Sequence, residues 1–197
     1  MNRDSICKLC YEHIENHLSE KRKTHTFGVR DTAVKLAKLY GADEEQAEIA
    51  ALFHDFYKYL DQEESDEYVK KLGLSDYYIG NKNLAHSKIA AAMMKEKYGI
   101  EDEDLINAVS FHTTGRENMS LLEKIIYLAD AIEPGRDYPM VDGLRRTAEN
   151  DLDQAVIDTL KGSLNHVMEA GQTLDPDSER ALEYLLTKQK TNNDQRR

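Results

Sequence analysis

Long apolar segments are missing from this chain. No uninterrupted apolar run approaches the roughly 18 residues that a membrane-spanning helix needs. The first residues, Met1 to Asp4, also lack the apolar centre of a secretory signal peptide. We therefore expect a cytoplasmic protein that does not use a membrane as a partner.

Cysteine is almost absent as well. The two cysteines, Cys7 and Cys10, stand three residues apart, which is close to one helical turn. A single C-x-x-C pair without a second pair is a weak indication of zinc. We expect two reduced thiols on one face of a helix rather than a metal or redox centre.

Basic residues are outnumbered by acidic ones. The chain has 26 Lys and Arg residues against 37 Asp and Glu residues, for a formal net charge of −11. A nucleic-acid backbone or an anionic membrane surface needs a broad basic surface on its protein partner. The charge balance excludes nucleic acid and membrane as general partners, so an anionic small molecule would have to be held by local cations.

Proline is scarce, and β patterns are absent. The three prolines lie where other signals already predict loops, and apolar residues recur at helical spacing instead of alternating. A chain of 197 residues with 40% hydrophobic content is long enough to bury one core. The sequence predicts an all-α fold, a compact helical bundle, with a single domain over residues 1–187 and a disordered polar tail over 188–197.

Capping residues and stop signals set the predicted helix boundaries. Asp43 with Gln46, and Ser120 with Glu123, match the capping-box pattern, and glycines follow the ends of several helices. The acidic stretch over residues 61–66 is predicted to be an exposed connection. The predicted helices cover approximately residues 4–18, 25–40, 43–54, 83–99, 102–115, 120–133, 151–170 and 178–187.

Six potential metal ligands fall on inward-facing positions of these predicted helices. The adjacent pair His54 and Asp55 is the most informative part of this set, because two different ligand types stand side by side. One buried histidine is more often a hydrogen-bonded core residue than a ligand. Burying the whole set without a cation would leave polar groups uncompensated. The set, which predicts a metal centre, is His25, His54, Asp55, His86, His112 and Asp130.

The four safest ligands are His25, His54, Asp55 and Asp130. Their mixed nitrogen and oxygen donors suit iron, manganese, cobalt or another divalent ion better than structural zinc, which favours thiolates. A bound divalent cation lowers the pKa of a coordinated water from about 15.7 to roughly 7. The sequence therefore predicts a hydrolase that obtains its nucleophile from water.

His86 and His112 have two alternative roles beside this centre. They could hold a second metal that Asp55 bridges, or they could form hydrogen bonds with a substrate phosphate beside a single metal. Sequence spacing does not separate these two cases. In both, Asp55, His86 and His112 are the candidate catalytic residues.

Cationic and hydroxyl side chains stand close to the ligand positions in the sequence. Arginine suits forked contacts to phosphate and lysine acts as a point charge, so these residues predict an anionic phosphate substrate. We call this set the phosphate cradle. It consists of Arg22, Lys58, Thr113, Thr114 and Arg136.

Four other polar residues are better explained by structure. His13 and His17 have the i, i+4 spacing of a metal clip, but the sequence between them does not form H-E-x-x-H, so a polar helix face is favoured. His166 has no partner in the sequence and is predicted to be structural. For Glu133, a surface salt bridge is favoured over a contact with the metal ligands.

The chain resembles the HD-domain superfamily, and more narrowly its YqeK-type branch, the bacterial symmetrical diadenosine tetraphosphate hydrolases. The similarity extends from about Arg22 to Ser178. The last two of the matching motifs, in this order, make the resemblance specific. The motifs are Arg22-x-x-His25-x-x-Gly28-Val29, His54-Asp55-x-x-Lys58, Ala85-His86, His112-Thr113-Thr114-Gly115 and Leu128-Ala129-Asp130-x-Ile132-Glu133-Pro134-x-Arg136.

This resemblance implies an HD-type, iron-dependent enzyme that cuts diadenosine tetraphosphate in the middle to give two ADP. A small-molecule dinucleoside polyphosphate or nucleotide is then the partner, and a homodimer is an open alternative to a monomer. The resemblance also implies two groups of site residues. Metal binding falls to His25, His54, Asp55 and Asp130, and contact with the phosphates to Arg22, Lys58, His86, His112 and Arg136.

Three other functions are compatible with the same residues. One is a phosphohydrolase of another nucleotide, such as a mononucleotide phosphatase or a cyclic phosphodiesterase. Another is a nucleotide-binding regulatory protein without turnover, which the intact ligand set disfavours. A third is an iron oxygenase, which the phosphate-facing cations disfavour.

Overall fold

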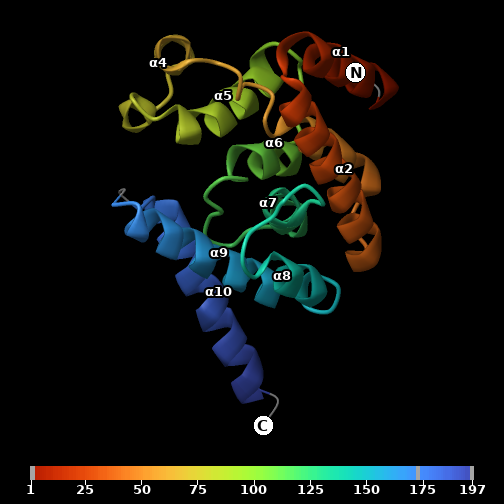
Figure 1. Cartoon of the computed structure of the whole chain (residues 1–197), viewed down its shortest axis with the longest axis vertical. Coiled ribbons are helices and arrows are strands. Elements are labelled where there is room, and N and C mark those ends of the chain that lie inside the picture. Colours follow the sequence, from red (N-terminus) through yellow and green to blue (C-terminus); the bar gives the residue numbers. More distant parts are fainter. Residues whose placement is uncertain (1–2, 172–173, 196–197) are drawn as a thin grey trace.

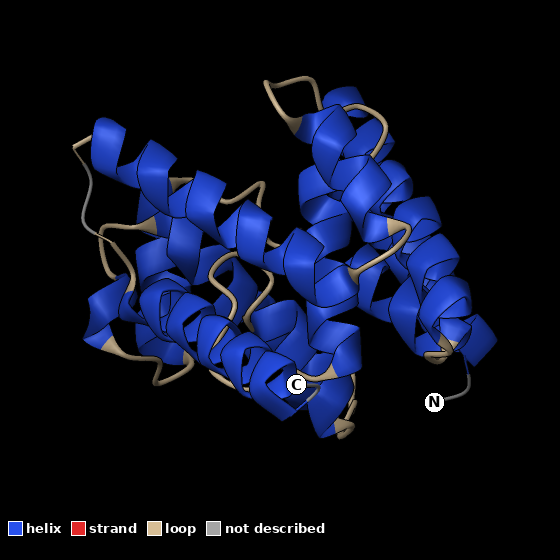
Figure 2. Cartoon of the chain, turned by 90° about the horizontal axis from the view of Figure 1, so that it is seen from below, coloured by secondary structure: helices blue, strands red, loops and turns tan. Residues whose placement is uncertain are grey.

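The computed structural model describes residues 3–171 and 174–195, and the regular structure in these residues is helical (Figure 2). The predicted all-α class is confirmed. No helix in these ranges is both long and apolar enough to cross a membrane. The helices are α1 (Arg3–His17), α2 (Glu20–Tyr40), α3 (Glu44–Phe53), α4 (Gln62–Lys71), the 3-10 helix η1 (Asp76–Tyr78), α5 (Lys82–Glu96), α6 (Glu103–Ser110), α7 (Leu121–Ile132), α8 (Val141–Ala148), α9 (Leu152–Glu169) and α10 (Pro176–Gln195).

Helix α7 is the central element of the bundle. It packs against α2, α3, α6, α8 and α9 (Figure 1), and it contributes Ile125, Ile126 and Leu128 to the fully buried core. A helix that is apolar on most of its surface can be satisfied only in such a position. Because α2 and α3 pack on α7, the polar residue Asp130 near the end of α7 lies beside residues of both helices.

Two of the predicted helix caps are present, although the capping boxes are incomplete. The Asp43 side chain accepts backbone hydrogen bonds at the start of α3, and Ser120 accepts one at the start of α7. The reciprocal contacts predicted for Gln46 and Glu123 do not form. The Gln46 side chain instead donates to the residue that caps α6, and the Glu123 carboxylate binds Arg116.

Two α-helices and the 3-10 helix η1 were not predicted. The acidic stretch that starts at Asp61 is exposed at Asp61, Glu63 and Glu64, as predicted, but it is the start of α4, where Asp61 and Glu64 form a complete capping box. The capping box was not recognised because charged residues predominate in this stretch of the sequence. Helix α8 was also missed because it is only two turns long, and its buried residues Val141 and Leu144 stand just after a proline.

Helix α10 is longer than predicted. Its backbone is helical from Pro176 to Gln195, so residues 188–195 are not the disordered tail that the sequence predicts, and residues 196–197 lie outside the described residues. No proline or glycine interrupts the helix after Pro176. The Gln189 side chain also donates a hydrogen bond to Gln154 on α9, which ties this part of the helix to the bundle.

Helix α1 packs on α3 and supports the segment that follows it. Cys7 and Cys10 on α1 are both free and buried. His13 is not part of a polar surface face, because its ring stacks on Phe56 with a centroid distance of 3.7 Å and its Nε2 lies 2.8 Å from the Phe56 carbonyl oxygen. Burial lowers the pKa of His13 to about 4, so this ring is neutral at pH 7.

Candidate metal centre

The His54-Asp55 pair lies where α3 ends. The helix stops at Phe53, His54 is its C-cap, and Asp55 belongs to the turn that follows, so the prediction that both stand on a helix was wrong. Phe53 and Phe56 are fully buried and draw the turn into the core. Because the chain leaves the helix here, the side chains of His54 and Asp55 both face one interior site, and they are 0% and 4% exposed.

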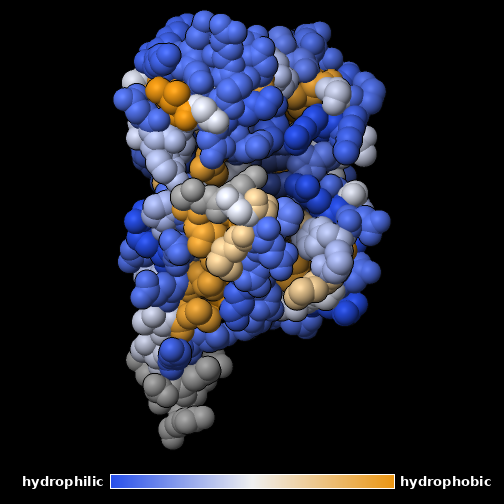
Figure 3. Space-filling model, turned by 60° about the vertical axis from the view of Figure 1, so that its left-hand side comes forward, coloured by the Kyte–Doolittle hydropathy of each residue, from blue (hydrophilic) through white to orange (hydrophobic). Residues whose placement is uncertain are grey.

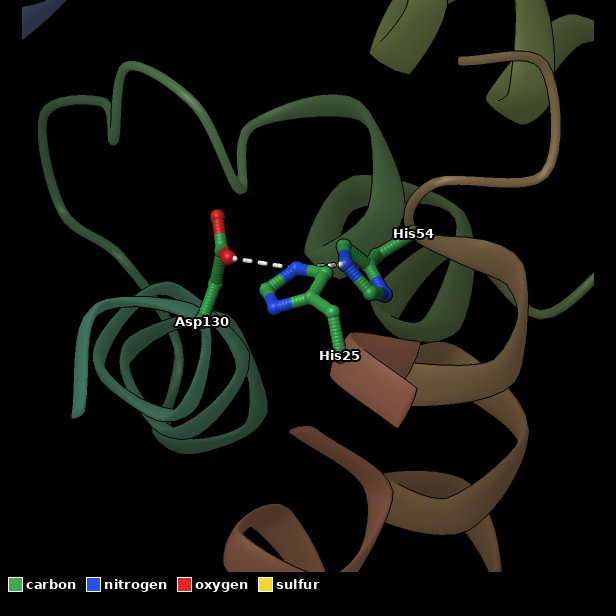
Figure 4. A group of neighbouring side chains, drawn as sticks. All are labelled: His25, His54 and Asp130. Carbon is green, nitrogen blue, oxygen red and sulfur yellow. Dashed lines mark hydrogen bonds and ion pairs between the residues drawn. The ribbon is translucent and has the colours of Figure 1, made fainter. Parts of the chain in front are cut away.

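His25 on α2, His54 at the end of α3 and Asp130 on α7 converge on one point (Figure 4). The ring of His25, on α2, lies between the other two side chains. Its Nε2 is 3.3 Å from Nε2 of His54 and 3.1 Å from Oδ1 of Asp130. Three donor atoms therefore stand within reach of one ion.

The hydrogen bonds of the two rings show that this group fits a cation. Nδ1 of His54 lies 2.6 Å from the Ala51 carbonyl oxygen, and Nδ1 of His25 lies 3.1 Å from Oε1 of Glu133. Each Nδ1 donates to an oxygen, so in the neutral rings both Nε2 atoms present lone pairs. Two nitrogen lone pairs and a carboxylate of Asp130 then face one another, an arrangement that positive charge must stabilise.

The ionisation of this group agrees with a demand for positive charge. Burial lowers the pKa of His25, but the carboxylates of Asp130, Glu133 and Asp55 outweigh it and raise that pKa overall. Asp130 is partly buried, yet the protonated form of His25, whose Nε2–H donates to its carboxylate, holds the pKa of Asp130 far below the usual range. A divalent ion bound by nitrogen and carboxylate donors supplies such charge, so the residues present fit a metal.

Asp55 joins this group to a second one. Its Oδ2 lies 3.7 Å from Nε2 of both His25 and His54, and its Oδ1 lies 3.2 Å from Nε2 of His86. Burial raises its pKa, but the neighbouring histidines dominate and hold the pKa well below the usual range. Asp55 is therefore a carboxylate with one oxygen directed at each group, the geometry that a bridging ligand needs.

His86 and His112 form the other side of the site. His112 lies in a turn after α6, not on the helix as predicted. The two Nε2 atoms are 3.1 Å apart, and Nδ1 of His112 lies 2.8 Å from the Val109 carbonyl oxygen. Burial lowers the pKa of both rings, that of His112 to about 3, so both are neutral at pH 7.

Arg22 and Arg136 of the phosphate cradle reach the centre through its carboxylates. One guanidinium nitrogen of Arg22 donates to Oδ2 of Asp55 at 2.7 Å. Arg136 donates to the carboxylate of Asp130 and, through Nε, to the backbone oxygen of the same residue at 2.7 Å. Both guanidinium groups are partly exposed, 42% and 40% by side chain, so each stands between the buried carboxylates and solvent.

Of the remaining cradle residues, Lys58 and Thr113 lie near His86, but Thr114 does not face the site. Lys58 Nζ lies 3.3 Å from Nδ1 of His86, and burial lowers its pKa. The Thr113 hydroxyl lies 3.4 Å from that of Ser87, the residue after His86. The Thr114 hydroxyl is buried and donates to the backbone oxygen of Gly115, so it does not face the site.

Glu133 has a different position from the surface salt bridge favoured by the sequence. It is 3% exposed and holds Nδ1 of His25 with Oε1, while Oε2 accepts the backbone N–H of Gly135. Helix α2 can approach this carboxylate because residue 28 is glycine. A Cβ atom at Gly28 would stand 2.6 Å from Oε2 of Glu133. The spacing of Gly28 three residues after His25 was the signal for this contact.

Arg145 on α8 was also not predicted to belong to the site. Its guanidinium donates to the backbone oxygens of Ile132, Glu133 and Arg136, at 3.0, 2.8 and 2.9 Å. These carbonyl groups lie at and beyond the end of α7, where a helix leaves acceptors unpaired. Arg145 therefore fixes the path of the chain between Asp130 and Arg136.

The family model described as HD domain matches residues 22–135, a span that includes all four proposed metal ligands. The chain belongs to the HD-domain family. HD domains are metal-dependent hydrolase domains, which agrees with the histidine and aspartate groups described above.

Two curated members of the family are similar over most of the chain. A protein of Halalkalibacterium halodurans named "Bis(5'-nucleosyl)-tetraphosphatase, symmetrical" is 44% identical over 191 residues, which cover 96% of this HD-domain chain and 100% of that protein. A protein of Bacillus subtilis with the same name is 39% identical over 175 residues, or 88% of this chain and 94% of the relative.

A solved structure confirms the HD fold. It is a protein of Clostridium acetobutylicum described as a predicted HD superfamily hydrolase involved in NAD metabolism. The two chains are 43% identical and superimpose with a TM-score of 0.87, covering 95% of this chain and 98% of the other. The helical HD architecture therefore extends over nearly the whole chain.

Proposed function

We propose that this HD-domain protein hydrolyses diadenosine tetraphosphate symmetrically, giving two molecules of ADP. The observation that carries the proposal is the 44% identity with a symmetrical bis(5'-nucleosyl)-tetraphosphatase over the full length of that protein. The chemistry of the site supports it, because a buried nitrogen and carboxylate centre lies beside partly exposed arginines. That combination suits an anionic phosphate ester.

His25, His54, Asp55 and Asp130 are the residues we assign to the metal, and iron is the ion we favour. Mixed imidazole and carboxylate donors suit iron, with manganese and cobalt as close alternatives. When bound, such an ion supplies Lewis acidity toward a phosphoryl oxygen and a water of lowered pKa. Glu133 keeps the His25 ring in the tautomer that directs Nε2 inward.

Arg22 and Arg136 hold the phosphates in this proposal. In the structure each guanidinium neutralises a carboxylate that we assign to the metal, Asp55 or Asp130. With a cation held by these carboxylates, both arginines would be free to bind phosphate oxygens through paired N–H groups. Phosphoryl transfer depends mainly on positioning and on neutralising charge, which is the work these residues perform.

His86, His112 and Lys58 are assigned to the phosphates rather than to a second metal. Lys58 donates to Nδ1 of His86, so the proton of the neutral His86 ring stands on Nε2. Nε2 of His86 can donate to Oδ1 of Asp55 or to Nε2 of His112. Nε2 of His112 is an acceptor because Nδ1 of the same ring donates to the Val109 carbonyl oxygen. The pair is therefore satisfied by hydrogen bonds, and a second ion would require Lys58 to move away.

No dedicated general acid is needed for central cleavage. The leaving ADP ends in a phosphate whose second pKa is about 6, so it departs as a stable anion near neutral pH. Neutralisation of charge by Arg22 and Arg136 then matters more than donation of a proton.

Metal depletion and re-addition test the proposed function. Turnover of diadenosine tetraphosphate should disappear after chelation and return with iron(II), manganese(II) or cobalt(II). A panel of mononucleotides, cyclic nucleotides and NAD, run in parallel, separates this function from hydrolysis of another nucleotide. Tight nucleotide binding with no turnover under any metal would identify a regulatory protein instead. The cytoplasmic location and the homodimer stay predictions.

A further inference from the structure

Two cavities flank the metal centre, and Arg136 and Tyr138 belong to the walls of both. One has a volume of about 860 Å³ and continues from the centre along α9, so we call it the α9 groove. The other has a volume of about 650 Å³ and opens beside α2. Both volumes fall in the range of about 300–1,000 Å³ that small-molecule sites have.

The chemistry of the α9 groove changes along its length. Its inner end is formed by His112, Thr113, Asp130 and Arg136. The residues of its wall that belong neither to the centre nor to α9 are mostly apolar or aromatic and include Tyr127, Ala131, Tyr138, Met140 and Leu144. An anionic group fits the part beside the centre, and a flat, largely apolar group fits against the apolar part.

The α9 wall carries polar groups that suit a nucleoside rather than further phosphate. Asn165 lines the groove, and its amide has no hydrogen-bond partner among the residues that the structure describes. An asparagine amide offers a donor and an acceptor side by side, which matches an adenine edge. Asp158 and Glu169 add negative charge, which disfavours phosphate but accepts hydrogen bonds from hydroxyl and amino groups.

The cavity beside α2 has the opposite character. Lys21, Arg22 and Arg136 contribute positive charge to it and outnumber the acidic residues Glu133 and Asp137. Thr24 contributes a hydroxyl, and the rings on its wall are His25, which belongs to the metal centre, and Tyr138. This surface suits phosphates but offers little for a base. The two cavities are therefore unequal, although the proposed substrate has two identical ends.

Tyr138 stands where the cavities meet. Its hydroxyl donates to the Ala131 backbone oxygen at 2.8 Å, which fixes the ring, yet the residue remains 38% exposed. Met140, two residues on, is 70% exposed and has a left-handed backbone with φ of 79°, a costly conformation for a non-glycine residue. On the face that Figure 3 shows, apolar side chains gather mainly in the lower half of the molecule, which holds α8, α9 and α10 (Figure 1).

We infer that the α9 groove is a nucleoside subsite, in which one base of the substrate lies against the Tyr138 ring and Asn165 contacts its edge. This inference rests on the proposed function, because it assumes a nucleotide whose phosphates reach the metal centre. The second nucleoside receives no comparable surface. Binding of one nucleoside in the α9 groove therefore determines which phosphate of the substrate reaches the metal centre, and so which bond is cut.

Binding of ADP to the metal-loaded protein tests the subsite without turnover. Calorimetry would compare ADP with tripolyphosphate, a probe without a nucleoside, for wild type, Tyr138→Ala, Tyr138→Phe and Asn165→Ala. Loss of one base-stacking ring corresponds to about 5- to 100-fold weaker binding, which we expect for ADP with Tyr138→Ala. Tripolyphosphate binding should stay unchanged, Tyr138→Phe should resemble wild type, and Asn165→Ala should also weaken ADP.

A matched control and a kinetic measurement complete the test. Met168→Ala changes a residue of α9 that is 53% exposed and does not line the groove, so it should bind ADP as wild type does. Unchanged ADP affinity in Tyr138→Ala, or an equal loss for tripolyphosphate, overturns the subsite. An equal loss of ADP affinity in Tyr138→Phe and Tyr138→Ala also overturns it, because ADP binding would then depend on the hydroxyl contact of Tyr138 and not on its ring.

The subsite and the proposed function fail in different ways. If wild type turns over diadenosine tetraphosphate but Tyr138→Ala and Asn165→Ala keep its KM, the subsite is wrong and the function stands. If wild type shows no turnover while ADP affinity still depends on the Tyr138 ring, the function is wrong and the nucleoside subsite stands. We expect turnover with a raised KM and a nearly unchanged kcat in both variants.

Discussion

Oε1 of Glu133 lies 3.1 Å from Nδ1 of His25, although the two residues are 108 positions apart in the chain. This contact determines which nitrogen of His25 faces His54 and Asp130. Since Glu133 is buried at the end of α7, the orientation of a proposed ligand on α2 depends on how closely these helices pack. Metal affinity and helix packing are therefore coupled in this protein.

Removal of the Glu133 carboxylate should weaken the metal site without removing a ligand. Groups that orient a ligating histidine typically contribute about 10- to 100-fold in metal affinity, so we expect a loss of that size in Glu133→Ala. Metal content after dialysis against defined free metal measures it. Glu149→Ala is the control, because Glu149 is exposed and pairs only with Lys35 among the described residues. Equal affinity in both variants would contradict the orienting role.

Gly28→Ala should disturb the same contact from the other side. The new Cβ would stand 2.6 Å from Oε2 of Glu133, so the carboxylate must move, and both stability and metal affinity should fall. Gly143→Ala is the matched control, because Gly143 is also inside a helix and has no described atom near its Cβ position. Replacing that glycine should stabilise the protein by about 0.5–1 kcal/mol. Urea unfolding of both variants gives the comparison, and equal stabilisation would exclude the close contact.

Asp55→Ala and Lys58→Ala should separate the metal site from the phosphate cradle. Asp55 directs an oxygen at each histidine group, so its loss should abolish both metal content and activity. Lys58 contacts His86 but none of the four proposed metal ligands, so Lys58→Ala should keep its metal and show a raised KM. Metal analysis beside steady-state kinetics checks this division. Equal metal loss in the two variants would undo it.

Stability should depend on pH through His13. Burial depresses its folded-state pKa from 6.5 to about 4, so the unfolded chain binds a proton here more readily than the folded chain does. The contribution of the neutral ring is present above pH 6.5 and is lost as pH falls from about 6.5 through about 4. As pH is lowered through this window, the unfolding temperature of wild type should therefore fall more steeply than that of His13→Gln. Parallel curves for the two proteins would be inconsistent with a buried neutral ring.

The helices and the buried ligands could be predicted because each rests on local signals. His25, His86 and Asp130 stand on apolar stripes of helical period, and those helices form. His54 and His112 were placed on helices because the same stripes continue through them, and Asp55 because it follows His54, but α3 ends at Phe53 and α6 at Ser110. The end of a helix is decided by contacts with distant residues, which a local pattern does not contain.

The contacts around the centre could not be predicted for the same reason. Glu133 meets His25, and Arg145 meets the end of α7, only after three helices have packed, and neither pairing has a fixed spacing in the sequence. Tyr138 and Asn165 lie 27 positions apart, in a loop and a helix that no motif connects. The nucleoside subsite therefore became visible only from the cavity that both residues line.

Product identity tests the central claim most directly. Metal-loaded protein would be incubated with diadenosine tetraphosphate, and the nucleotides separated by chromatography at several times, with Asp55→Ala as the inactive reference. Symmetrical hydrolysis predicts ADP as the sole nucleotide product, with two ADP formed for each substrate consumed. Equal amounts of AMP and ATP would contradict the account, because the metal centre would then act on a different phosphate from the one proposed.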